Sequence, residues 1–380
     1  MSVIAAAPVR PSIMSPALVR VFVASFGSLT SFFVLASVVP RFAASVGAGA
    51  AGAGLSTAAL MFATVGAEFA APWLATRFGY RSGLAVGLIL LGAPALALPY
   101  ATGLPAILAV AVVRGIGFAI VMVLGDALIP LLVPDERRGE ALGLGGVVAS
   151  VPGVVALPLG AWLVDQVGYT GVFVLGGVAA LAALVAVPGL PEPRETSPSE
   201  KPRVVAGLRN RAISRPALTF GATAVAGGIV TAFLPLAVDG VAPAALLVQA
   251  AAATITRWWA GRQADRRGAA GLLVPAVVLS AAGMLAMALT ALPAVVLLGA
   301  VVFGAGFGVA QNASMVTMFD AVPRSGYGTA SALWNMAYDG GYGLGAAGCG
   351  IVAAQAGYPM AFALTAVVVA IAVVPARRCR

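Results

Sequence analysis

The sequence predicts an all-α membrane protein whose twelve helices cross the bilayer in two bundles of six. Three observations lead to this fold class: a very apolar composition, twelve apolar stretches of spanning length, and an internal repeat. Hydrophobic residues make up 61% of the 380-residue chain and charged residues 9%, with a mean hydropathy of +1.02. Soluble domains carry about 25% charged residues, so this composition excludes an ordinary water-soluble globule.

Each apolar stretch is long enough to cross a membrane as a helix. A hydrocarbon core about 30 Å thick needs roughly 20 apolar residues per helix, and short polar or Gly/Pro-rich joints separate stretches of this length. Barrel strands would alternate polar and apolar residues, and runs such as LTAVVVAIAVV do not. The expected spans are residues 17–39, 54–75, 83–102, 105–131, 142–164, 171–188, 216–238, 244–260, 271–291, 294–318, 329–354 and 360–375.

The basic residues predict the orientation of these spans. With the N-terminus inside, nineteen of the 22 basic residues fall in cytoplasmic segments, whereas Arg41 falls in an outside loop. We therefore expect a multi-pass protein of the cytoplasmic membrane with both termini in the cytoplasm, and an N-terminal stretch that is retained. The net charge of +9 follows from this topology and does not indicate nucleic-acid binding.

The chain repeats itself at an offset of 189 residues. Arg77 and Gly79 match Arg266 and Gly268 in this register. Further matches join Gly115, Gly117 and Phe118 to Gly304, Gly306 and Phe307, and Gly168, Tyr169 and Phe173 to Gly357, Tyr358 and Phe362. Because each half holds six spans, the halves form a parallel repeat. The predicted division is a bundle over residues 1–187, a cytoplasmic linker over 188–215 and a second bundle over 216–380.

Several chemistries lack the residues they need. The chain has no histidine and two cysteines, Cys349 and Cys379, neither of them in a C-x-x-C pair. We therefore expect no metal site, no cofactor, no catalytic residues and no enzyme activity. No GxxxxGK[ST] segment occurs, so the chain lacks the phosphate-binding loop that an ATP-driven pump would carry.

Two loop segments carry a family resemblance. GRQADRRG follows the eighth span and PWLATRFGYR the second, and with twelve spans in two parallel halves they resemble the G-x-L-A-D-R-x-G-R-R loop of the major facilitator superfamily (MFS) of transporters. The second copy keeps Gly261, Asp265, Arg266 and Gly268, and the first keeps Leu74, Arg77, Gly79 and Arg81. The first copy has Thr76 at the aspartate position, so the resemblance implies an asymmetric latch in which Asp265 ties the loop to the opposite half.

Two further segments are similar to MFS motifs. VVRGIGFA in the fourth span is similar to R-x-x-x-G-x-G-F, although Arg114 lies three residues after the family's arginine position, which is Ala111 here. ALPLGAWLVDQVGY, residues 156–169, is similar to the motif that closes the fifth span of drug and metabolite exporters. The resemblance implies export by two halves that rock about a central site.

Five ionisable residues lie inside the predicted spans. Each costs on the order of 3 kcal/mol there, so each is a candidate functional residue: Glu68, Arg114, Asp126, Arg257 and Asp339. Glu68 and Arg257 occupy equivalent positions of the repeat. Glu68 either gains and loses a proton as the cavity alternates between the two sides, or pairs permanently with a nearby arginine.

The other two carboxylates also have two interpretations each. Asp126 in the fourth span either accepts a proton or a cationic substrate, or is a buried partner for Arg77 or Arg81. Asp339 lies among glycines that permit close helix approach, in YDGGYGLGAAG. Since the resemblance places the eleventh span against the second, we expect Asp339 to act as a gate element that pairs with the loop motif or an interface arginine, or else to carry the proton.

Uncharged candidates for the substrate cavity come from the fourth and tenth spans. Phe118 and Met122 could form an apolar wall, and Gln311 and Asn312 could hold a polar group of the substrate. Helix-to-helix packing is the alternative for all four, and a hydrogen bond of that kind contributes about 0.6 kcal/mol on average.

These expectations combine into one functional hypothesis. The protein is expected to be a monomeric transporter that exports a small amphiphilic drug or metabolite in exchange for protons. Proton-coupled uptake of a small nutrient is the alternative within the same fold. A membrane enzyme or assembly factor is the alternative from a different class, and the absence of a nucleophile–base pair argues against it.

Overall fold

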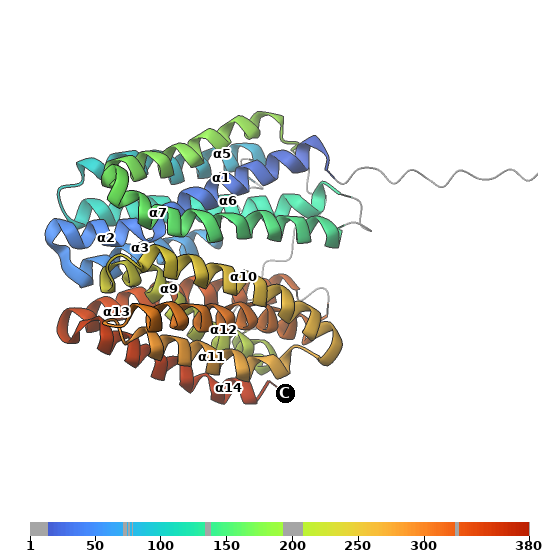
Figure 1. The fold of residues 1–380 in the computed structure, drawn as a ribbon. Helices are drawn as coiled ribbons and strands as arrows, with labels where there is room; N and C mark the ends of the chain where they lie inside the picture. The colour runs from blue at the N-terminus through green and yellow to red at the C-terminus, as the bar shows by residue number, and fades with distance from the viewer. Residues whose placement is uncertain are drawn as a thin grey trace, which may run out of the picture.

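The computed structural model describes residues 14–70, 74, 77, 79–133, 138–192, 208–323 and 327–379. Throughout these residues the regular structure is helical, and none of them forms a strand. Figure 1 shows long helices running side by side, with the start of α1 and the C-terminus at the same end of the molecule. We call this end the termini side. The predicted all-α fold is confirmed.

The N-terminal bundle begins where Ser15 caps the first helix by accepting a hydrogen bond from the Leu18 N–H at 3.2 Å. The chain reverses through Gly47 and Gly49, whose φ angles of 91° and 60° suit glycine. The elements are α1 (Pro16–Ala36), α2 (Val38–Ala43), a π turn (Ala44–Ala48), α3 (Gly49–Glu68), α5 (Tyr80–Gly92), a 3₁₀ segment (Ala93–Tyr100), α6 (Leu104–Leu131), α7 (Arg138–Ala182) and a second 3₁₀ segment, η4 (Ala183–Gly189).

The C-terminal bundle repeats this order of helices. Its elements are α9 (Arg211–Ala237), α10 (Ala242–Arg267), a 3₁₀ turn (Ala270–Leu272), α11 (Leu273–Met287), α12 (Pro293–Asp320), α13 (Tyr327–Ile371) and α14 (Val373–Arg377). Residues 193–207 of the predicted linker lie outside the described residues, so the predicted division at 188–215 stays a prediction.

The two longest helices, α7 and α13, are each two membrane crossings joined at a glycine. The backbone reverses at Gly168 (φ 70°) and at Gly357 (φ 80°), in the region where L side chains are strained. Eight apolar segments of the described chain are long enough to span a membrane, and three of these, Pro16–Glu68, Leu144–Gly189 and Thr329–Arg377, each hold two crossings. The twelfth crossing is α10, which is less apolar because it includes Gln249 and Arg257.

The internal repeat is present in the backbone. Gly79 and Gly268 both have positive φ, as do Gly168 and Gly357, and each pair is separated by the predicted offset. Equivalent close approaches recur as well. A Cβ at Gly115 would collide with the Leu60 carbonyl, and a Cβ at Gly304 with the Gln249 carbonyl, at positions that correspond in the two halves.

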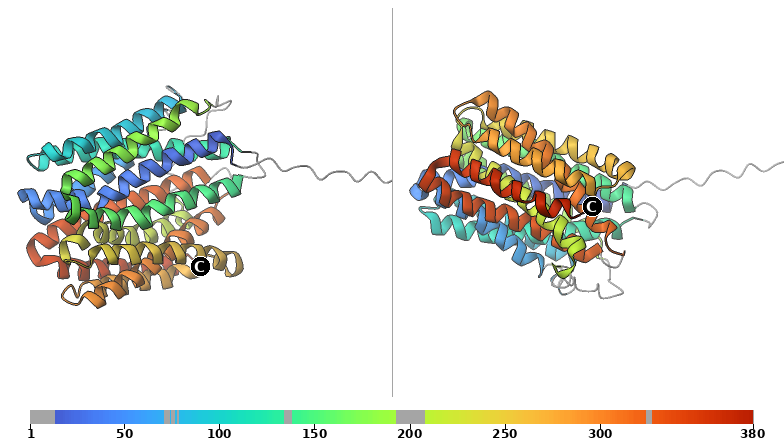
Figure 2. Two further views of the ribbon diagram at one scale, coloured as in Figure 1. Left: turned by 45° about the horizontal axis from the view of Figure 1, so that its top comes forward. Right: turned by 90° about the horizontal axis from the view of Figure 1, so that it is seen from below.

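Small residues bring the two bundles together along α3 and α13. A Cβ at Gly54 would collide with the Ala346 carbonyl, and a Cβ at Gly350 would lie 2.7 Å from the Ala50 carbonyl. The helices α7 and α10 form a second contact between the bundles, and Figure 2 shows this arrangement from two further directions. A cluster that includes Phe32, Phe118 and Tyr342 fills the space between the halves near mid-length.

Candidate functional site

The structure brings three of the five predicted intramembrane charges into one network and leaves two outside it. Glu68 of α3 and Asp339 of α13 contact each other, and Arg257 of α10 interacts electrostatically with Tyr338, the neighbour of Asp339. Arg114 makes its contacts elsewhere, with Leu91 and Ser31. The network therefore joins residues of both bundles.

The carboxyl groups of Glu68 and Asp339 share a hydrogen bond. Glu68 is the last residue of α3 and is half-buried, whereas Asp339 is 7% exposed. An ionised carboxylate only accepts hydrogen bonds, so two carboxyl groups can bond to each other only when one carries a proton. The arrangement therefore favours a proton shared within this pair.

This partnership differs from the arginine partners considered from the sequence. Asp339 was expected to pair with the loop motif or an interface arginine, and its contact is the Glu68 carboxyl. Among the described residues, an ion pair forms between Arg41 and Asp165 at 2.9 Å, at the end of the molecule opposite the termini side.

Two tyrosines that the sequence analysis missed flank Asp339. Tyr338 lies next to it and within electrostatic range of Arg257, and Tyr342 lies one turn further along α13. Tyr338 also packs between aromatic rings of α9 and α13, with ring centroids 5.6 Å from Phe220 and 5.9 Å from Trp334. The signal was present in YDGGYG, where the tyrosines are spaced four residues apart and so share one helix face.

Arg114 is buried at 1% exposure and donates only to neutral oxygens. Its Nε bonds the Leu91 carbonyl at 3.1 Å, and its Nη2 lies 3.3 Å from the Ser31 carbonyl. Its Nη1 has no hydrogen-bond partner. Arg114 also lines a cavity of about 20 Å³, which we call the central cavity; its other lining residues are Phe32, Leu35, Ala36, Val39, Pro40, Ser56, Thr57, Leu60, Met61 and Tyr342.

Phe118, Met122 and Asp126 follow one another at four-residue intervals and therefore share one face of α6. Phe118 stacks on Phe32 with ring centroids 4.4 Å apart, and Met122 packs against the same cluster. Asp126, nearer the termini side, is exposed. The guanidinium of Arg81 donates to the Leu190 carbonyl, with Nε at 3.1 Å, so this arginine has a partner other than Asp126.

Gln311 and Asn312 lie on α12. The Asn312 side chain faces Gly261 of α10, 3.5 Å from where a Cβ would stand, and its buried Oδ1 has no partner. Gln311 is half-buried. Asn312 is therefore placed where α10 and α12 pack near the second loop motif, a location that favours helix packing over substrate contact.

The first loop motif is tied to its own bundle. The Glu192 carboxylate accepts hydrogen bonds from the Tyr80 and Arg81 N–H groups at 3.0 and 2.9 Å, where α5 begins, and an anion is favourable at a helix N-terminus. Gly79 makes the preceding turn, as Gly268 does in the second copy. Thr76 and the Asp265 side chain lie outside the described residues, so the asymmetric latch stays a prediction.

Arginines of both loop motifs are exposed. Arg77 and Arg266 are accessible to solvent, and Arg262 lies over the Trp258 ring at 3.9 Å from its centroid. This cation–π contact is a further feature that the sequence analysis did not identify.

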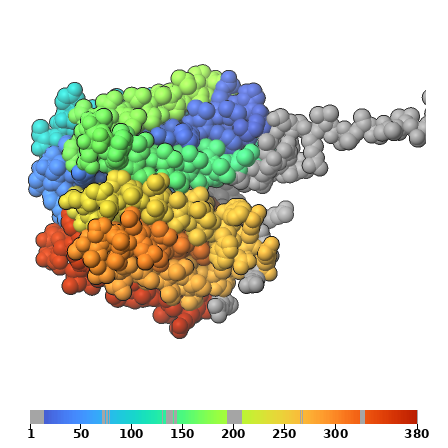
Figure 3. Space-filling view, in the orientation of Figure 1, coloured from blue at the N-terminus to red at the C-terminus, as the bar shows by residue number. Residues whose placement is uncertain are grey.

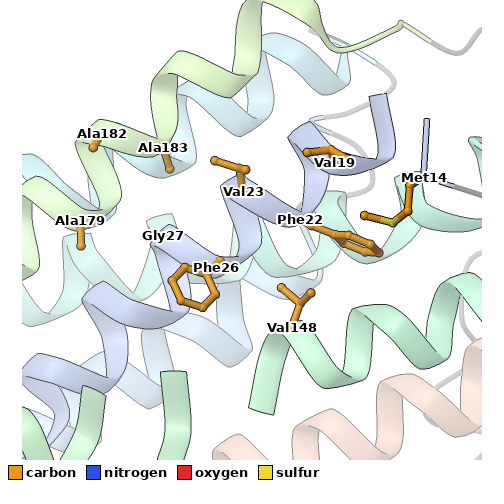
Figure 4. Close-up of a pocket in the computed structure, with 10 residues that line it drawn as sticks. All are labelled: Met14, Val19, Phe22, Val23, Phe26, Gly27, Val148, Ala179, Ala182 and Ala183. Atoms are coloured by element: carbon orange, nitrogen blue, oxygen red, sulfur yellow. The ribbon is translucent and has the colours of Figure 1, made fainter. Parts of the chain in front are cut away.

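The larger cavity, of about 450 Å³, is an apolar groove beside α1. Figure 4 shows Val19, Val23 and Phe26 of α1 beside Ala183 of η4 and Val148 of α7. In Figure 3, this part of α1 reaches the surface between the two arms of α7. The groove has no side chain that could hold a charge, so it is a poorer candidate for polar chemistry than the central cavity.

Comparisons with known proteins agree on one family. The family description "Major Facilitator Superfamily" matches residues 21–346 and 245–378. An MFS-type transporter of Mycobacterium tuberculosis is 29% identical over 180 residues, which cover 46% of this chain and 31% of that protein.

Solved structures show the same fold. A bacterial homologue of the human lysosomal transporter Spinster, in an inward-facing and occupied conformation, has a TM-score of 0.78 with 17% identity, over 96% of this chain and 97% of that one. The xylose transporter of E. coli has a TM-score of 0.76 with 14% identity, over 95% and 97% of the two chains. A nucleoside transporter has a TM-score of 0.76 with 14% identity, over 96% and 99%.

Proposed function

We propose that this chain, which belongs to the major facilitator superfamily, exports a small amphiphilic drug or metabolite in exchange for protons. The chain is a multi-pass membrane transporter rather than an enzyme. We place it in the cytoplasmic membrane as a monomer, with both termini in the cytoplasm. The observation that carries the proposal is the carboxyl pair of Glu68 and Asp339, which bridges the two bundles.

The pair supports proton coupling because its two halves belong to different bundles. Glu68 is on α3 and Asp339 on α13, so their hydrogen bond can exist only while these helices stay close. When the bundles separate at the termini side, each carboxyl meets water and can release its proton. Protonation then favours closure of this side, and deprotonation favours its opening.

The groups around the pair suit this role. Arg257 lies within electrostatic range of Tyr338, and both Tyr338 and Tyr342 lie near Asp339. A neighbouring cation favours the ionised form of an acid, so Arg257 would assist release of the proton once the hydrogen bond breaks. This arrangement gives each of the three ionisable residues a separate part in the cycle.

The aromatic residues between the bundles support an amphiphilic substrate. Phe32 and Phe118 of the N-terminal bundle face the same cluster as Tyr338 and Tyr342 of the C-terminal bundle. Aromatic faces bind the apolar part of a ligand, while a few polar groups fix its orientation. Phe118 and Met122 thus remain candidate substrate contacts.

Everted membrane vesicles test the direction and the coupling together. Vesicles acidified inside should accumulate at least one member of a panel of fluorescent amphiphiles, and Glu68→Gln and Asp339→Asn should each abolish this accumulation. Asp239→Asn, which changes an exposed acid in the turn after α9, is the matched control and should transport normally.

Uptake instead of export is the second candidate function, and the same assay distinguishes the two. The xylose and nucleoside transporters share the fold, so uptake by proton symport is the second candidate. Vesicles that accumulate no amphiphile, from cells that take up a nutrient only when the chain is produced, would contradict export and support symport.

A further inference from the structure

Arg114 is a buried cation without an anion. Its contacts are the Leu91 carbonyl, the Ser31 carbonyl and the Ser31 hydroxyl, all of them neutral. Buried charges in proteins are normally paired with a charge of opposite sign, because neutral dipoles compensate only part of the lost hydration. The positive charge of Arg114 and its Nη1 donors are therefore uncompensated in this conformation.

No carboxylate that the structure describes is placed to supply the missing charge. Asp126 is twelve residues further along α6, about 18 Å away at 1.5 Å per residue. Glu68 is eleven residues beyond Thr57 on α3, about 16 Å along that helix, and is already bonded to Asp339. Within the part of the chain that the structure describes, Arg114 therefore has no anionic partner, and a ligand is the remaining source of one.

A second unpartnered polar group lies in the same cavity. Thr57 of α3 lines the central cavity together with Arg114, and its buried hydroxyl has no hydrogen-bond partner. The neighbouring Ser56 hydroxyl, by contrast, donates to the Ala53 carbonyl at 2.8 Å. The cavity thus has a cationic donor and a neutral donor on its surface, both free, and aromatic walls at Phe32 and Tyr342.

We propose that Arg114 and Thr57 bind a carboxylate group of the transported molecule, whose aromatic or aliphatic part lies against Phe32 and Tyr342. The inference rests on the proposed function and narrows its substrate class to amphiphilic carboxylates. A planar guanidinium matches a carboxylate well, so Nη1 would donate to one oxygen and the Thr57 hydroxyl to the other.

The cavity as observed is too small for such a ligand. A volume of about 20 Å³ has room for roughly one water molecule. Tyr342 belongs to the C-terminal bundle and the other side of the cavity to the N-terminal bundle, so separation of the bundles would enlarge it. The site would therefore open and close with the transport cycle.

A purely structural role for Arg114 explains fewer observations. Its Nε and Nη2 tie α6 to α5 and α1, and this accounts for two of its three nitrogens. It accounts neither for the free Nη1 nor for the free Thr57 hydroxyl facing the same space. The two roles also predict different results for substitution of Thr57, whose hydroxyl forms no hydrogen bond to another helix.

The test is thermal unfolding of the purified full chain in detergent with matched ligand pairs. The probes are phenylacetate, indole-3-acetate and decanoate, each compared with its neutral amide at equal concentration. We expect at least one carboxylate to raise the Tm of the wild type and its amide to have no effect. A wild type that responds to no carboxylate, or equally to carboxylate and amide, would overturn the proposal.

Variants locate the site. Arg114→Gln should weaken carboxylate binding roughly tenfold to hundredfold, as expected for loss of a hydrogen bond to a charged group. Arg114→Lys should retain part of the binding. If Arg114→Gln proves unstable, Thr57→Val decides, because it keeps the shape of the side chain and should weaken binding several-fold.

Thr64→Val is the matched control on the same helix. The Thr64 hydroxyl is already bonded to the Leu60 and Gly115 carbonyls, so this change should leave carboxylate binding as in the wild type. Equal binding by Thr57→Val and the wild type would overturn the proposal. The assay uses no proton gradient, so its failure is distinct from failure of the proposed antiport.

Discussion

At the scale of single residues, the carboxyl pair shows how two acidic side chains can lie within a membrane at a smaller cost in free energy. An isolated ionised acid within a membrane is unfavourable by a few kcal/mol, and a shared proton removes one of the two charges. Glu68 and Asp339 achieve this through one hydrogen bond between helices of different bundles. The interaction of these two side chains therefore depends on their length as well as on their charge.

Exchanging the two acids tests the effect of side-chain length separately from the effect of charge. Glu68→Asp shortens one arm of the pair by a methylene group while keeping a carboxyl, and Asp339→Glu lengthens the other. We expect each single change to reduce proton-driven transport by about tenfold, which corresponds to roughly 1.4 kcal/mol, and the double exchange to recover much of the loss. Transport assays in vesicles measure this, and additive losses in the double variant would argue against a direct contact.

At the scale of the helices, glycine decides how closely neighbours approach. The Gly115 and Gly304 positions allow α6 to lie against α3 and α12 against α10 at equivalent points of the two halves. The repeat was visible in the sequence for this reason, because a side chain at either position would push the helices apart. The structure adds a second use of glycine, because the chain reverses at Gly168 and Gly357, where φ is positive.

Adding one methyl group tests this packing. Gly304→Ala places a Cβ against the Gln249 carbonyl and should destabilise the fold by about 1–3 kcal/mol, whereas Gly348→Ala adds the same group where no atom lies within 4 Å. Thermal unfolding in detergent should show a lower Tm for Gly304→Ala and an almost unchanged Tm for Gly348→Ala. Similar Tm values for both variants would mean that the close packing of α10 against α12 does not contribute to the stability of the fold.

Contacts between distant segments could not be predicted in the same way. The sequence left two roles open for Glu68, proton exchange or a permanent pair with a nearby arginine, and it did not identify Asp339 as the residue that the packing of α3 on α13 places beside Glu68. The free Nη1 of Arg114 depends on where the side chains of three helices leave space, which no local pattern encodes. Composition, the length of the apolar stretches and the internal repeat thus predicted the fold, and tertiary packing determined the site.

At the scale of the whole molecule, the two bundles meet along α3 and α13 and along α7 and α10, with the central cavity and the carboxyl pair between them. A transporter of this fold alternates between states open to either side, and a ligand or proton shifts the balance only if it binds one state more tightly. The carboxyl pair meets this requirement because its hydrogen bond forms only when α3 and α13 are close.

The central claim is that protonation of this pair controls closure of the termini side, and a distance measurement between the bundles tests it directly. Spin labels at Leu131→Cys and Ala321→Cys, exposed positions at the ends of α6 and α12, report the separation once Cys349 and Cys379 are replaced by alanine and serine. We expect the distance to lengthen as the pH is raised from about 5 to about 9, the range in which buried carboxyl groups of proteins titrate. Glu68→Gln with Asp339→Asn should keep the short distance throughout, and a shift of the same size in that double variant would contradict the account.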